Sequence, residues 1–449
     1  MLRHLVAAVA AAAIAGAPPA RADEPAAPAP LLLPLPLFEV PRSLDLGYRF
    51  PTWEQATSLH HALIAGGHHA VHLAAWHFLG GSPFWAYFAE MGGTSLLDFG
   101  SVVLPFGQGW VHEEGHASAM AIVGLSTRQA FNPFSMCDEG SVCGLTDAQI
   151  ASVHDRRAAD WVRVQEAGME TELENAAWVE RDVFFSDRPA YQHIPYLALQ
   201  LVNVEAYRLI CTAPGAITAA DVLAESPEVT NRDFTGPDCT GWVFDLFRPA
   251  TPYSDRGPHP LGGIRRIRLL EDLTPEESAY LGRMRNLGLL SFVDPFLFGF
   301  SGFQLPWPAG GPALRVNGAV RHHLTESGDL LELTLLGRRE QWKLEATLRA
   351  YSNQSHTFPG LSLRLHRLPL PFAGAFASAA VWLWVQPRDH DFFAAEGDPG
   401  GALQLEGALP VFPHGEAFLR FKAKTAGWMA GDAALDAAIQ GSVGINVVL

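Results

Sequence analysis

The chain has 449 residues, of which 48% are hydrophobic and 17% are charged. This is the composition of a folded protein with a substantial core, so a disordered chain is excluded. The 47 acidic residues outnumber the 31 basic ones and give a formal net charge of -16. Nucleic acid is therefore excluded as the main partner, because phosphate binding needs a basic surface.

The N-terminus has the pattern of a secretory signal. Arg3 supplies a positive charge, the apolar stretch over 5–17 is too short to span a bilayer, and Ala20-Arg21-Ala22 is an A-x-A cleavage site. We therefore predict a signal peptide over 1–22 and an exported protein, located in the periplasm or outer membrane of a Gram-negative bacterium. Residues 23–52 are Pro-rich and are predicted to form an extended linker or surface strap.

The four cysteines fit an exported protein. An even number of cysteines in such a chain predicts disulfides. We favour the most local pairing, Cys137–Cys143 with Cys211–Cys239. The two other pairings, or four free thiols, are the alternatives that the sequence leaves open.

Residues 53–295 are predicted to form a helical, metal-binding domain. A 3.6-residue period and N-cap signals such as Thr146 predict the helices, and a loop is expected over 212–260. The helical stretches are 53–80, a segment around 112–123, 147–156, 158–185, 196–211 and 271–288. His68 and His72 share one face of the first helix, so a second metal site is conceivable there, although an ordinary polar helix face is favoured.

From about residue 296 the period changes to two. Runs such as Leu331, Leu333 and Leu335 alternate with polar residues, and turn signals separate them. We predict an antiparallel barrel or meander of about eight strands over 296–449, which makes the whole chain α+β. The apolar side chains could face a soluble interior, or they could face outer-membrane lipid as the barrel's partner. The alternation is the same in both cases.

The sequence His112-Glu113-Glu114-Gly115-His116 matches the H-E-x-x-H motif. On a helix the two histidines lie one turn apart on one face, so both imidazoles can bind one Zn²⁺. Zinc lowers the pKa of a bound water, and Glu113 is then the candidate general base. The motif opens an apolar segment that stops at Gly124, which is typical of a buried helix.

A catalytic zinc needs a third protein ligand, and the later helix over 158–185 is the best source. It carries Glu166, Glu170 and Glu174 on one face, with Gly168 permitting a close backbone approach. We predict Glu170 as the ligand, with Glu166 or Glu174 orienting a ligand histidine. Glu174, Glu166 and Glu205 remain rival ligands, and His154 and His193 are weaker ones.

This arrangement resembles the zincin metallopeptidases, specifically the pattern in which a glutamate from a later helix completes the site. The resemblance implies His112 and His116 as zinc ligands and Glu113 as the general base. The stretches 110–116, 144–147 and 167–170 also look like those of a poorly characterised group of exported bacterial H-E-x-x-H proteins. That similarity covers roughly residues 90–300 and names no substrate.

The leading functional hypothesis is a zinc-dependent hydrolase of the bacterial envelope. A metallopeptidase acting on a peptide or protein substrate is the favoured class. The alternative is a non-enzymatic outer-membrane or periplasmic β-barrel protein with a structural or vestigial metal site. Glu113 distinguishes the two, because a purely structural site does not need a general base.

Overall fold

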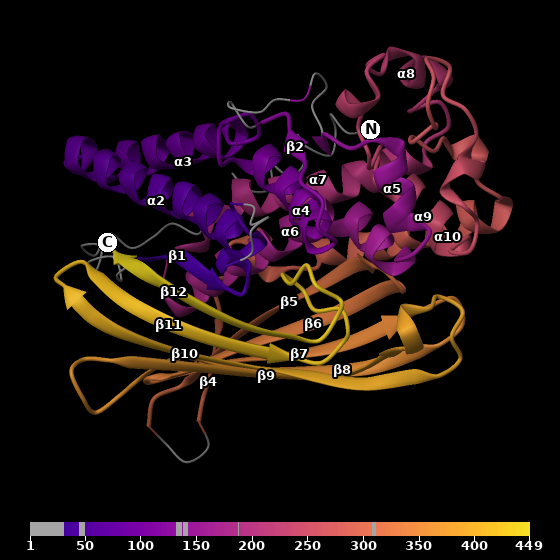
Figure 1. Cartoon of the computed structure of the whole chain (residues 1–449). Coiled ribbons are helices and arrows are strands. Elements are labelled where there is room, and N and C mark those ends of the chain that lie inside the picture. Colours follow the sequence, from indigo (N-terminus) through magenta and orange to yellow (C-terminus); the bar gives the residue numbers. More distant parts are fainter. Residues whose placement is uncertain (1–30, 45–49, 132–136, 138–141, 187, 308–310) are drawn as a thin grey trace.

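The structure is a computed structural model that describes residues 31–44, 50–131, 137, 142–186, 188–307 and 311–449. A layer of helices lies on one face of a large antiparallel sheet (Figure 1). The chain is therefore α+β, as predicted, with its helical part preceding most of the strands. The predicted signal peptide over 1–22 lies outside the described residues.

The helices largely follow the predicted stretches. Threonine side chains at 52, 146 and 274 accept hydrogen bonds from the first turns of α2, α5 and α10 and so define where these helices begin. Helices α3, α8 and α9 lie where no helix was predicted, and the last two fall within the stretch 212–260 that was expected to be a loop. The helices are α2 (Trp53–Leu79), α3 (Pro83–Gly100), α4 (Gln108–Ile122), α5 (Asp147–His154), α6 (Ala158–Phe185), α7 (Ile194–Thr212), α8 (Ala219–Ala224), α9 (Cys239–Phe247) and α10 (Pro275–Gly288).

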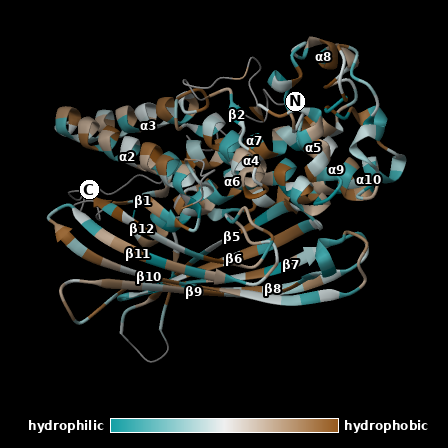
Figure 2. Cartoon of the chain, viewed as in Figure 1, coloured by the Kyte–Doolittle hydropathy of each residue, from teal (hydrophilic) through white to brown (hydrophobic). Residues whose placement is uncertain are grey.

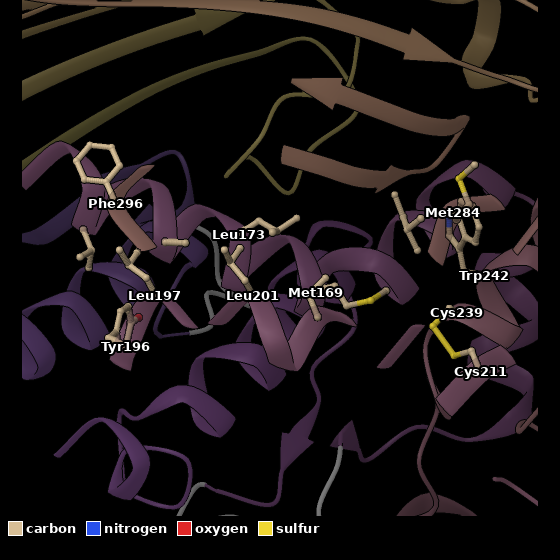
Figure 3. Packing of buried hydrophobic residues seen from close by; sticks show 14 of the residues in the cluster. Met169, Leu173, Tyr196, Leu197, Leu201, Cys211, Cys239, Trp242, Met284 and Phe296 are labelled. Carbon is tan, nitrogen blue, oxygen red and sulfur yellow. A yellow bond between two sulfur atoms is a disulfide. The ribbon is translucent and has the colours of Figure 1, made fainter. Parts of the chain in front are cut away.

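Helix α6 runs through the centre of the helical layer, and most of its residues are buried. Its apolar side chains Met169 and Leu173 belong to one core cluster with Leu201 of α7 and Met284 of α10 (Figure 3). Because α6 is held on several sides, its side chains are well fixed, which suits a helix that builds a site. Among the described residues, no helix combines the length and the apolar character needed to cross a membrane.

Ten strands form one open sheet in the order β1-β12-β11-β10-β9-β8-β7-β6-β5-β4. The prediction of a closed barrel of about eight strands is therefore wrong in closure and in strand number. The Pro-rich segment contributes β1, which pairs with β12 and not with β4 at the other edge. The strands are β1 (Leu32–Val40), β4 (Phe303–Leu305), β5 (Leu314–Thr325), β6 (Gly328–Arg339), β7 (Trp342–Ser352), β8 (Thr357–Pro369), β9 (Phe376–Pro387), β10 (Gly397–Phe412), β11 (Gly415–Lys424) and β12 (Ala438–Val448); β2 (Arg128–Gln129) and β3 (Val142–Cys143) form a separate pair.

The face of the sheet that packs against the helices is the polar one. Arg321 of β5 forms a buried ion pair with Glu180 of α6, and Glu345 of β7 lies 3.6 Å from Arg181 of the same helix. Hydrophobic and hydrophilic positions alternate along the strands (Figure 2). The apolar positions consequently point away from the helical layer.

Both favoured disulfides are present. Cys137 pairs with Cys143, and Cys211 of α7 pairs with Cys239 at the start of α9. The second bond lies at the Trp242 and Met284 end of the core cluster (Figure 3). Disulfides are typical of proteins exported to an oxidising compartment, so they agree with the predicted export.

Candidate metal centre

Helices α4 and α6 cross at glycines, which brings the H-E-x-x-H motif against α6. A Cβ added to Gly115 of α4 would lie 2.6 Å from the carbonyl oxygen of Ala167. A Cβ added to Gly168 of α6 would lie closer than 3.0 Å to Nε2 of both His112 and His116. The two glycines therefore make room for the backbones and for the imidazoles between them.

His112, His116 and Asp238 bring three ligand atoms to one point. The two histidine Nε2 atoms are 3.3 Å apart, and the carboxylate oxygens of Asp238 lie 3.3 Å from Nε2 of His112 and 3.4 Å from Nε2 of His116. The three residues are only 3%, 1% and 2% exposed. They form the one group within the described part of the chain that could hold a metal ion by the spacing of its ligand atoms.

The hydrogen bonds made by the Nδ1 atoms of the two imidazoles orient their Nε2 atoms toward one another. Nδ1 of His112 lies 2.9 Å from Glu172, and Nδ1 of His116 lies 2.6 Å from the carbonyl oxygen of Val164. Since both partners are acceptors, each Nδ1 carries a proton, and each Nε2 faces the carboxylate of Asp238. Two imidazole nitrogens and a carboxylate thus converge in a buried space, an arrangement that could hold a metal ion.

The size of this triangle fits a metal ion. An ion with tetrahedral bonds of about 2.0–2.1 Å holds its ligand atoms about 3.3–3.4 Å apart. The two histidine Nε2 atoms have this separation, and each lies 3.3 or 3.4 Å from a different oxygen of Asp238. Oδ2 of Asp238 is buried and lies 3.3 Å from Nε2 of His112, and Oδ1 lies 3.4 Å from Nε2 of His116, so both carboxylate oxygens face the histidines. Imidazole and carboxylate ligands suit zinc and other first-row divalent metals.

The backbone holds Asp238 in an unusual conformation. Its φ of 55° and ψ of -71° place it in the left-handed half of the map, which a non-glycine residue rarely adopts. It is the N-cap of α9, and the next residue, Cys239, is bonded to Cys211 of α7. The disulfide therefore anchors the loop that carries Asp238.

The charges in the centre are strongly coupled. Burial alone would lower the pKa of His112, but hydrogen bonds to Asp238 and Glu172 raise this pKa well above its ordinary value. Burial favours a raised pKa for Asp238, but the charge of His116 and hydrogen bonds to both histidines hold that pKa well below its usual range. The arrangement thus favours an anionic Asp238 facing positive charge, as in a metal site.

Glu113, the predicted general base, lies on α4 beside this group and is 7% exposed. Burial raises the pKa of its carboxyl to about 7, although the nearby His112 and His116 oppose this shift. The ring of Tyr207 from α7 stacks on His112 with the ring centroids 4.9 Å apart. Glu113 therefore lies close to His112 and His116, and Tyr207 stacks on one of the two imidazoles.

The structure does not bring Glu170 to the histidines. Its carboxylate forms a buried ion pair with Arg163 and accepts a hydrogen bond of 2.8 Å from the amide of Gly431. The reason is helix periodicity, because Gly168 faces the histidines and a residue two positions later points to the opposite side of α6. Glu172, four positions after Gly168, is the glutamate that meets His112, and Asp238 takes the position expected for Glu170.

The rival ligands also have other partners. Glu166 pairs with Arg163, Glu205 lies 2.7 Å from Arg208, His154 lies 2.8 Å from Asp155, His193 lies 3.0 Å from His68, and Glu174 lies outside the metal-binding group. The histidines of the conceivable second site bind acids of α3: His68 lies 2.6 Å from Asp98 and His72 lies 2.8 Å from Glu90. These are paired hydrogen bonds between α2 and α3.

Asp238 was not predicted as a ligand, because it lies in the stretch 212–260 that was expected to be a loop. One signal was present in the chain. Asp238 directly precedes Cys239, whose predicted disulfide ties this loop to the helix that ends near Cys211. An acid beside a disulfide cysteine is a weak signal by itself, since most aspartates in loops are solvated.

Comparisons of the chain with protein-family models, with curated proteins and with solved structures each gave no match. The resemblance to zincins therefore rests on the motif and its neighbouring stretches. The geometry of the site, formed by His112, His116, Asp238 and Glu113, is the structural observation that bears on function.

Proposed function

We propose that the protein is a metal-dependent hydrolase of the bacterial envelope, with zinc as its ion and a peptide bond as the favoured substrate. One observation carries this proposal: two imidazole nitrogens and a carboxylate converge at metal-binding distance, and Glu113 lies beside them in the same helix. A purely structural site has no need of Glu113, whereas hydrolysis needs a group that moves a proton.

Each residue of the candidate site has a separate role in the proposed hydrolysis. His112, His116 and Asp238 would hold the ion, which supplies a Lewis acid that polarises a carbonyl and acidifies a water. Glu113 is placed to accept a proton from the attacking water and to return it to the leaving amine. Glu172 accepts the hydrogen bond from Nδ1 of His112 and so keeps Nε2 directed at the ion.

A second candidate function is a structural metal site in a non-enzymatic protein. Its support is burial, because the three ligands are at most 3% exposed and Glu113 is 7% exposed. A structural ion would have all four positions filled by the protein, whereas a catalytic one keeps a position open. The two functions therefore differ in the coordination of the ion and in the effect of changing Glu113.

The test compares the protein with two variants. Metal content by mass spectrometry is expected to be about one zinc per chain, and a His112→Ala/His116→Ala double variant should lose it. Glu113→Gln should keep the zinc and lose the hydrolysis of fluorescent casein and of a quenched peptide library by about a hundredfold or more.

The zinc and hydrolysis measurements together distinguish the two candidate functions. Protein without zinc after loading and mild dialysis would overturn the metal site itself. Zinc without hydrolysis of any peptide, together with X-ray absorption showing four protein ligands, would establish the structural function instead. Full hydrolysis by zinc-loaded Glu113→Gln would remove Glu113 from the mechanism.

A further inference from the structure

The outer face of the sheet, on the side away from the helices, is apolar from strand to strand. Strand register places Leu333, Leu348, Leu361 and Leu383 in one row across β6, β7, β8 and β9. All four are exposed, by between 38% and 58%. A neighbouring row contains Leu363, Val381 and Leu403, which are also exposed.

The inner face of the same strands carries the charged residues. In register, Glu332 pairs with Arg349, Glu345 with Arg364, and Glu406 with Arg420. This polarity is the reverse of an ordinary two-layer protein, in which the apolar side of a sheet packs on the helices. The sheet therefore buries its charges beneath the helical layer and presents aliphatic side chains outward.

A second apolar surface lies on α3. Phe84, Phe88, Leu96 and Phe99 are between 55% and 77% exposed. The polar residues Glu90 and Asp98 of this helix are instead turned toward histidines of α2. Helix α3 lies beyond α2 as seen from the sheet (Figure 1), so the two apolar surfaces are on different sides of the molecule.

We propose that the outer face of the sheet and the exposed face of α3 contact the hydrocarbon of a lipid bilayer. Hydrocarbon matches a surface without charge, and the strand positions in register with Leu348 and with Leu363 on the outer face of β6–β12 are all uncharged. A bilayer that surrounds the molecule would contact both apolar surfaces, although they lie on different sides. A second copy seated on the sheet would leave the face of α3 in water.

The dimensions of the outer face agree with this partner. The exposed apolar positions of β10 run from Leu403 to Val411, a stretch of nine residues, and a tilted membrane strand needs about 9–11 residues to cross the hydrocarbon. The lipid-facing band of outer-membrane strands is about 25 Å tall and is edged by aromatic residues. Exposed aromatics lie at one end of this sheet, with Trp342 at the start of β7, Phe372 between β8 and β9, and Phe412 at the end of β10.

The experiment uses the full chain, purified in detergent and diluted into vesicles of dioleoylphosphatidylcholine. The protein should float with the vesicles in a density gradient, and vesicles of brominated lipid should quench its tryptophan fluorescence. Leu363→Lys/Leu383→Lys should reduce the floating fraction about tenfold or more, and Phe88→Lys should also reduce it.

The matched control variants carry Leu→Lys changes at exposed positions outside the two apolar surfaces. Leu223 on α8 and Leu261 are 54% and 44% exposed, close to the 51% and 58% of Leu363 and Leu383. Leu223→Lys/Leu261→Lys should float like the unchanged protein. Circular dichroism, measured on every variant, shows whether it is folded, so the lipid proposal depends on neither the proposed zinc nor the proposed hydrolysis.

Two results would overturn the proposal. The first is a folded protein that stays at the bottom of the gradient with or without vesicles. The second is a concentration-dependent dimer in sedimentation experiments that Leu363→Lys/Leu383→Lys dissociates while Phe88→Lys does not. The second result would identify a second copy of the chain as the occupant of the sheet face.

Discussion

Gly168 of α6 lies directly against the imidazole of His112. The space that any Cβ at position 168 would need is taken by Nε2 of His112 and by Nε2 of His116. A glycine inside a long helix ordinarily lowers helix stability by about 1 kcal/mol relative to alanine. Gly168 therefore lowers the stability of α6 but leaves room for the two imidazoles of the candidate metal centre.

The first prediction follows from that contact. Gly168→Ala should weaken zinc binding by about tenfold or more, because the methyl group displaces both ligand imidazoles. It should also destabilise the protein by about 1–3 kcal/mol through overpacking. Competition with a chromophoric chelator measures the affinity, and denaturant unfolding measures the stability.

The control is Gly282→Ala in α10, where an added Cβ would have no atom within 4 Å. This change should leave zinc affinity unaltered and should raise stability by about 0.5–1 kcal/mol. If the two alanine variants bound zinc equally well, the histidines would not occupy the space in front of Gly168.

The second prediction separates Glu172 from Glu170. Glu172→Gln should lower zinc affinity about 10- to 100-fold, because a neutral amide is a weaker acceptor for Nδ1 of His112. Asn203 donates a 2.5 Å hydrogen bond to the same oxygen of Glu172, so the side chain should stay in place. Zinc titration of the purified variants gives the measurement.

Glu170→Gln is the matched change two residues away. It should leave zinc affinity unchanged but should cost about 3 kcal/mol of stability, since it removes a charge from the buried ion pair with Arg163. The opposite pattern, with zinc lost in Glu170→Gln and retained in Glu172→Gln, would restore Glu170 as the third ligand.

Local sequence patterns were sufficient to predict part of this structure. The spacing of His112 and His116 brought two candidate ligands together, because residues four apart on a helix share a face whatever surrounds them. Asp238 could not be found in that way, because it reaches the site through the packing of α9 and its disulfide. The alternation of β6–β12 gave the strands, but it could not show that the Pro-rich segment would pair with β12 and leave the sheet open.

The third prediction concerns pH and His154, which is remote from the metal-binding group. Burial alone would lower the pKa of His154, but Asp245 and Asp155 raise it above 6.5, with Arg256 opposing them. A raised folded-state pKa means that this stabilisation is complete below pH 6.5 and is lost as the pH rises through the folded-state value.

The free energy of unfolding should therefore differ most between the unchanged protein and His154→Gln below pH 6.5. The difference should shrink as the pH is raised. Denaturant unfolding at a series of pH values measures it, and His356→Gln, which alters an exposed histidine, is the control. A difference that is constant with pH would show that His154 does not gain a proton on folding.

The last prediction links the disulfide of Cys211 and Cys239 to the metal. Asp238 has a positive φ that the free chain disfavours, and the neighbouring disulfide holds it against α7. Cys211→Ala/Cys239→Ala should cost about 3–4 kcal/mol of stability and should also weaken zinc binding, because Asp238 can then leave the histidines. The Cys137–Cys143 disulfide closes a shorter loop. Cys137→Ala/Cys143→Ala should therefore lower stability by about 2 kcal/mol and leave zinc affinity unchanged. Equal zinc affinity in both double variants would mean that the packing of α9 alone positions Asp238, whereas a loss confined to the first would show that oxidation of this cysteine pair completes the metal centre.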